Sequence, residues 1–466
     1  MFVHQSSKNQ MPTSINRTFW RYAIPSVAAM LVNGIYQIVD GIFIGQYVGY
    51  QGLAGINMAW PIIYVFAGIG LMIGMGSGSL LSINRGENAQ HCDSKESSLA
   101  VINGTLASAI ILILVFGLLG SFALNFSVDT LLQLQGGTGQ TLLMAQQYTM
   151  PFVWSLVFTI LATAIPILIR NDESPNIATG LMVMGACLNI ALDYLLIVKF
   201  DLALHGAAIA TISAQVAVSI AGIGYFLSSK TRVEFIASKF KFNPKLARQI
   251  LLLGVSSLVM YLYTSFVFAL HNRLFMEYGS SLTVGAFAIV GYLMVLYYFI
   301  AEGLGEGMQP PVSFFFGADQ PKNIKRMVIL ATKVTISAGV LWVLILNIFP
   351  NSIIGLFNSD DPVLLKETIT GIQLHLFAMY LDGFIVLSIM YFMAVNQGGK
   401  SLFISVANMM IQLPFLYFLP KWLGVTGVWL ALPLSNVALF LIVAPMVWKH
   451  LNSAINSETH QRLSAA

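Results

Sequence analysis

The chain has 466 residues, of which 57% are hydrophobic, 12% are aromatic and only 9% are charged. A soluble domain carries about 25% charged residues, so this composition indicates a protein that crosses the membrane many times. A net charge of +4 spread over a hydrophobic chain is not the clustered basic surface that nucleic-acid binding needs. The two cysteines, Cys92 and Cys187, are far apart and predict neither a disulfide framework nor a metal site.

Apolar runs long enough to cross a membrane recur along the whole chain. A spanning helix needs about 20 mostly apolar residues, and by that criterion the sequence predicts twelve spans. They cover residues 18–46, 52–82, 97–122, 143–169, 174–198, 205–228, 245–274, 281–316, 323–349, 363–395, 400–421 and 424–449. The expected fold is therefore an all-α membrane protein.

The distribution of Lys and Arg predicts the orientation. With both termini in the cytoplasm, most basic residues fall in cytoplasmic loops, as the positive-inside rule requires. We expect a multi-pass protein of the inner (plasma) membrane. The longest polar connection, residues 229–248, is basic and is interpreted as a cytoplasmic linker. It separates a six-helix lobe of residues 1–228 from a second six-helix lobe of residues 249–466.

An internal repeat supports these two halves. The second half can be laid on the first at an offset of about 231 residues, which matches Tyr47 with Tyr278 and Gly76 with Gly307. Transporters are often built from two related halves with the substrate site between them. The sequence therefore predicts two pseudo-symmetric lobes that run in the same direction.

Asp40 is the first candidate for a functional residue, because acids at membrane depth are costly and mark functional sites. It lies in the first predicted span, fifteen residues after Pro25. A carboxylic acid in a low-dielectric site resists ionisation and can hold a proton or a cation. Pro25 disrupts a helix interior and gives this helix a place to bend. The alternative is a structural acid bonded to a neighbouring helix.

A second group of polar residues follows in the fifth and sixth spans. Asn189 and Asp193 are four residues apart and share a helix face, and Thr211 could join them. These oxygens suit a hard cation or a protonated carboxylate, although packing between helices explains the spacing equally well.

Three further acids are secondary candidates. Glu302 and Glu306 share one helix face, and Asp382 is alone in the tenth span. Pro310 and Pro311 predict that the helix carrying the two glutamates is broken or kinked. His271 and His375 are expected nearer to span ends.

The sequence resembles the multidrug and toxic compound extrusion (MATE) transporters over essentially its whole length. The resemblance rests on twelve spans in two halves and on the block Val39–Gly45 followed by Gly52–Gly55. It rests also on Gly305–Pro310 followed by Phe316–Ala318, and on the pair Asn189 and Asp193. The family implies two six-helix lobes, alternating access and export of cationic or amphipathic drugs in exchange for H⁺ or Na⁺.

Within that family the chain is most similar to the DNA-damage-inducible branch. That resemblance implies a cation site in the N-terminal lobe, formed by Asp40, Asn189, Asp193 and Thr211, with the first helix bending at Pro25. The other large branch uses a Glu of the seventh helix with an Asp of the tenth. This chain has Asp382 but only His271 in its seventh span, which argues against a site of that kind.

The expected function is therefore secondary active drug efflux with Asp40 as the coupling carboxylate. Asn33 and Tyr36 are expected to contact the drug through polar and cation–π interactions. The alternative is a lipid-linked oligosaccharide flippase, although the charges at membrane depth are almost all acidic and favour a cationic substrate. An enzyme is not expected, because the sequence has no HExxH or GxSxG motif. We expect no resident metal and no cofactor beyond H⁺ or Na⁺ as coupling ion, with Na⁺ possible at the four site residues, no nucleic-acid partner, and a monomer in the lipid bilayer.

Overall fold

The computed structural model describes residues 14–90, 95–135, 139–355 and 362–464, and within them the chain is helical throughout its regular structure. It forms two compact units. The N-terminal unit covers Ala28–Leu262, and the C-terminal unit combines Met1–Val27 with Tyr263–Ala466. The first helix, α1 (Ile15–Tyr47), begins in the C-terminal unit and continues into the N-terminal unit. The reverse holds for α8 (Pro244–Tyr278), which begins in the N-terminal unit.

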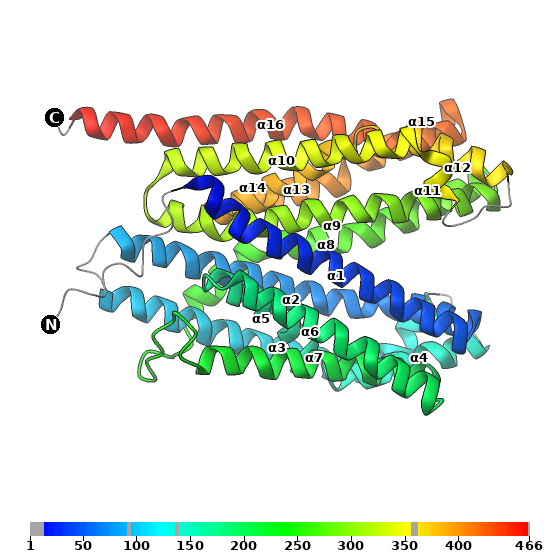
Figure 1. Cartoon of the computed structure of the whole chain (residues 1–466), viewed down its shortest axis with the longest axis horizontal. Coiled ribbons are helices and arrows are strands. Elements are labelled where there is room, and N and C mark those ends of the chain that lie inside the picture. The colour runs from blue at the N-terminus through cyan, green and yellow to red at the C-terminus, as the bar shows by residue number, and fades with distance from the viewer. Residues whose placement is uncertain (1–13, 91–94, 136–138, 356–361, 465–466) are drawn as a thin grey trace. The chain divides into compact units, whose positions relative to one another are not determined.

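The N-terminal unit is a bundle of long helices that lie side by side (Figure 1). Besides the second part of α1 and the first part of α8, it contains α2 (Tyr50–Gln90), α3 (Lys95–Leu134), α4 (Gly139–Val153), α5 (Leu156–Asn171), α6 (Pro175–Asp193), the π-helix η2 (Tyr194–Lys199) and α7 (Ala203–Leu227).

The C-terminal unit is a second helical bundle. It contains α9 (Ser281–Gly317), α10 (Pro321–Ile348), α11 (Pro350–Ile354), α12 (Pro362–His375), α13 (Met379–Ala394), α14 (Gly398–Met410), α15 (Gln412–Leu423) and α16 (Val425–Ser464). Nearly every side chain of α13 is buried, so this helix forms the centre of the unit.

The predicted number of spans is confirmed. Among the described residues, ten helical segments are long and apolar enough to cross a membrane, and two bent helix pairs bring the number to twelve. The pairs are α4 with α5, bent by 67°, and α12 with α13, bent by 49°. Each pair is the fourth span of its half.

Helix ends repeat at the offset read from the sequence. Helix α1 ends at Tyr47 and α8 ends at the matching Tyr278. Helix α2 begins at Tyr50 and α9 begins at Ser281, again about 231 residues later. The two halves are therefore related in structure as well as in sequence.

Matched glycines lie where helices approach each other closely. In the C-terminal unit, a Cβ on Gly307 would lie 2.7 Å from the Cα of Ala23 in α1. In the N-terminal unit, a Cβ on the matching Gly76 would collide with the backbone carbonyl of Ile250 in α8. Small residues let membrane helices pack backbone to backbone, and here they fix the first part of each shared helix to its unit.

The break expected near Pro310 and Pro311 is absent, because α9 continues through both residues to Gly317. Proline is tolerated inside membrane helices, where neighbouring helices satisfy the freed backbone groups. Helix α1 likewise runs through Pro25 without interruption.

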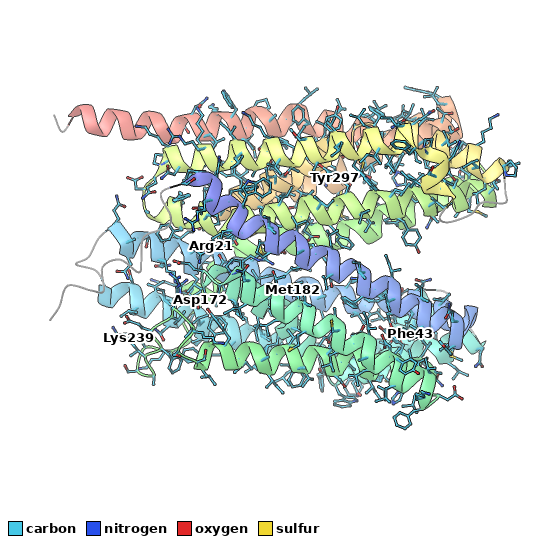
Figure 2. The ribbon with its side chains drawn as sticks, viewed as in Figure 1. Arg21, Phe43, Asp172, Met182, Lys239 and Tyr297 are labelled. Carbon is cyan, nitrogen blue, oxygen red and sulfur yellow. The ribbon has the colours of Figure 1, made fainter. Side chains whose placement is uncertain are left out.

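The basic segment after α7 is bonded to the N-terminal unit. The amide of Asn103 in α3 donates to the carbonyl of Glu234 (3.0 Å), and its oxygen accepts from the backbone of Ile236 (3.0 Å). The hydroxyl of Thr231 donates to the carboxylate of Asp172 (2.9 Å). Asp172 and the loop that carries Lys239 lie at the same end of this unit (Figure 2). Helix α8 begins at Pro244, inside the expected linker.

Candidate functional site

Asp40 lies in the part of α1 that belongs to the N-terminal unit and is 3% exposed. Its Oδ1 atom is buried and has no hydrogen-bond partner among the described residues. Buried polar groups are normally paired, so this carboxylate lacks a donor or a cation.

Asn189, Asp193 and Thr211 are brought together, as their spacing predicts. The side-chain amide of Asn189 donates to the hydroxyl of Thr211 across the interface of α6 and α7 (3.2 Å). That bond leaves Asn189 Oδ1 buried with no partner in the described structure. Both carboxylate oxygens of Asp193 are buried and equally lack one. Three side chains of this unit, counting Asp40, thus present acceptor oxygens that no described donor reaches.

Asp40 and Asp193 belong to one site, because their carboxylates are close enough to interact electrostatically. Two neighbouring buried carboxylates repel each other when both are charged. The arrangement can therefore be stabilised by a proton or by a small cation. Both ligands supply the positive charge or the donor that the unpaired oxygens need.

Sequence analysis missed Tyr148 of α4. This residue is fully buried, its hydroxyl has no hydrogen-bond partner within hydrogen-bonding geometry, and it interacts with Asp40, Asp193 and the hydroxyl of Thr211. The only signal in the sequence was a polar run, Gln146 to Thr149, inside an apolar span.

A second feature that the sequence did not predict is the π-helix η2, which begins directly after Asp193. Single π-helical turns inside α-helices occur often at functional sites. Here the change of helix type follows the carboxylate that has the most unpaired atoms in the site.

The expected drug-contacting residues lie on α1 before Asp40. Asn33 and Tyr36 are half-buried, and Tyr36 interacts with both Asp40 and Tyr64 of α2. Tyr64 packs against Trp60 (ring centroids 4.8 Å apart) and edge-on against Tyr261 of α8 (5.4 Å). This aromatic group, which sequence analysis also missed, lies beside the Asp40 site.

The secondary acids belong to the C-terminal unit. Glu302 and Glu306 are buried within α9 and not in water at a helix end. Asp382 lies in α13 with Oδ1 buried and unpaired among the described residues, and its carboxylate interacts with Tyr263, Tyr297 and Tyr298. Figure 2 labels Tyr297, whose hydroxyl donates to the carbonyl of Thr335 (3.1 Å).

Comparison with known proteins agrees with this architecture. The MatE family model matches residues 25–195 and 256–418. The chain is 27% identical over 440 residues to the multidrug export protein MepA of Staphylococcus aureus (strain MRSA252), covering 92% of this chain and 93% of that protein.

Solved structures share the fold. A transporter of the MOP superfamily from Pyrococcus furiosus matches with a TM-score of 0.87 at 19% identity, over 96% of this chain and 99% of that one. An outward-facing multidrug resistance MATE family transporter matches with a TM-score of 0.86 at 20% identity, with the same coverage. With twelve spans in two related halves and a family match over most of its length, this chain is a multi-pass membrane protein and belongs to the MatE family of multidrug and toxic compound extrusion transporters.

Proposed function

We propose that this protein exports cationic or amphipathic drugs in exchange for H⁺ or Na⁺, with Asp40 as the coupling carboxylate. The observation that carries the proposal is the set of unpaired acceptor oxygens on Asp40, Asn189 and Asp193, buried in one unit. A proton or Na⁺ bound there would satisfy them. When the ion leaves, the negative charge attracts a cationic drug.

The aromatic group beside the site supports a cationic substrate. Aromatic rings attract cations that lie over their faces, and Tyr36 connects Asp40 with Tyr64. Drug and coupling ion would then compete for one carboxylate, so that binding of the ion from outside releases the drug. The name of the relative, a multidrug export protein, favours a drug over a lipid-linked oligosaccharide.

Proton coupling is the version of this mechanism that we favour. A sodium ion needs several oxygen ligands, and the acceptors contributed by Asp40, Asn189, Asp193 and Thr211 are few for a complete shell. The use of these four positions supports membership of the DNA-damage-inducible branch. Helix α1 would bend at Pro25 when Asp40 changes charge, because proline removes a hydrogen bond from the helix interior.

Orientation and cellular location belong to the same proposal. The positive-inside rule supports cytoplasmic termini and an inner (plasma) membrane location. A monomer suffices, since all the proposed site residues come from one chain.

The test is efflux of a cationic dye from liposomes under an imposed proton gradient or an imposed sodium gradient. We expect efflux under the proton gradient, lost in Asp40→Asn and retained in Asp129→Asn, a matched control at an exposed position of the same unit. Efflux that Asp40→Asn leaves unchanged would move the coupling site to Glu302, Glu306 or Asp382. Absence of dye efflux from the wild type would reject drug export itself.

A further inference from the structure

Two histidines that the proposed exchange does not use lie together in the C-terminal unit. His271 of α8 is 0% exposed and His375, the last residue of α12, is 1% exposed. Their rings pack edge to face, with centroids 5.3 Å apart and planes at 80°. The expectation that they lie near span ends did not bring them together.

Hydrogen bonds to the backbone define the tautomer of each ring. His271 Nδ1 lies 2.9 Å from the carbonyl oxygen of Val267, and His375 Nδ1 lies 2.8 Å from that of Trp429. A carbonyl oxygen only accepts, so each Nδ1 carries the hydrogen. In a neutral imidazole the other nitrogen is then a bare acceptor. Both Nε2 atoms are buried without a hydrogen-bond partner.

Aromatic rings enclose the pair. Phe287 stacks on His271 (5.5 Å, 17°) and meets His375 edge-on (5.6 Å, 89°), and Trp429 lies 5.7 Å from His375. The aromatic faces favour a positive charge on either imidazole. The indole N–H of Trp429 can donate to one lone pair at most, which leaves the second nitrogen bare.

The charged residues of the surrounding helices face elsewhere. On α8 and α12, Arg273, Glu277 and Lys366 are exposed. The helices α9 and α16 contribute apolar and aromatic side chains to this cluster, and the titratable side chains packed with it are the phenols of Tyr278 and Tyr297. The groups that determine whether a charge is tolerated are therefore the two imidazoles and the rings around them.

A proton is the ligand that fits such a place. Phe287 and Phe275 are 0% exposed and Trp429 is 1% exposed, so the side chains are packed against one another, and a proton needs no space of its own. Bound to one Nε2, it turns that atom into a donor and leaves the other Nε2 to accept. A second proton would place two positive charges in one apolar cluster.

We propose that His271 and His375 form a proton-binding site of the C-terminal unit that takes up one proton, shared between the two Nε2 atoms. The site is independent of Asp40, which lies in the N-terminal unit. Because His375 ends α12, the proton arrives at the bend between α12 and α13.

The test is NMR of the full-length protein with ¹⁵N-labelled histidine in lipid nanodiscs, titrated from about pH 8 to about pH 5, where histidine changes charge. Ring ¹⁵N shifts distinguish the two neutral tautomers from the imidazolium. The resonances are assigned with His271→Phe, His375→Phe and His205→Phe, the last an exposed control in the N-terminal unit.

We expect both rings to begin as neutral Nδ1–H tautomers and to change together in one step. That step should disappear for the remaining ring in either single variant and persist in His205→Phe and in Asp40→Asn. Neutral rings throughout the titration, an Nε2–H tautomer at the start, or two independent steps would each overturn the proposal. The wild-type spectrum alone decides the tautomer and the joint step, even if a variant fails to fold. Loss of the step in Asp40→Asn would instead assign the observed change to the N-terminal site.

Discussion

Replacing Asp172 by alanine should release the loop after α7 and destabilise the N-terminal unit. Asp172 follows α5, is 0% exposed and pairs with the Arg85 guanidinium of α2. It also accepts hydrogen bonds from the hydroxyls of Tyr225 (2.6 Å) and Thr231 (2.9 Å) and from the backbone N–H of Arg232 (3.0 Å). Removing one partner of a buried ion pair costs about 3–5 kcal/mol. The Arg85 side chain is 11% exposed and can regain some water, so we expect about 3 kcal/mol.

Such a loss is large enough to measure by proteolysis. A loss of about 3 kcal/mol raises the open population of the loop on the order of 100-fold, and Arg232 and Lys239 in this loop are trypsin sites. We would measure the rate of tryptic cleavage there together with the unfolding midpoint. The control is Glu173→Ala, because Glu173 pairs with the 40%-exposed side chain of Arg232, and exposed ion pairs contribute less than about 1 kcal/mol. Equal cleavage rates and midpoints in the two variants would refute the assignment of Asp172 as the anchor.

Three further outcomes are expected. Gly307→Ala places a methyl group against the backbone of α1 and should lower the stability of the C-terminal unit by about 1–3 kcal/mol, measured as the thermal midpoint. Gly399→Ala, which has open space around it, should not. Thr211→Ala removes the acceptor of the Asn189 amide and should cost about 1 kcal/mol, whereas Thr211→Ser should restore the midpoint. Tyr36→Ala should weaken binding of a cationic dye by about 1–2 kcal/mol, whereas Tyr36→Phe keeps the ring and should retain affinity, as equilibrium binding measures.

The fold could be predicted because hydropathy reports span length directly. Each crossing needs a long apolar run, and even the bent pair around Trp154 was counted as one span. The continuity of α9 through Pro310 could not be predicted, because neighbouring helices, and not the local sequence, satisfy the backbone groups that a proline frees.

The candidate site was predictable only where its members lie close in the sequence. Asn189 and Asp193 are one helical turn apart, so their spacing indicates a shared face. Tyr148 meets Asp40 through the packing of α4 against other helices, which periodicity does not report. The same holds for His271 and His375, which come from different spans.

The exchange of first helices between the two units has a consequence for expression of the protein in pieces. A fragment ending at residue 228 would lack the first part of α8, and the backbone of α2 at Gly76 would lose its covering helix. A fragment beginning at residue 249 would lack residues 15–27, which cover α9 at Gly307. Each half therefore needs a segment of the other to complete its packing. Co-expressed halves should assemble, while either half alone presents an unfilled groove of backbone to lipid.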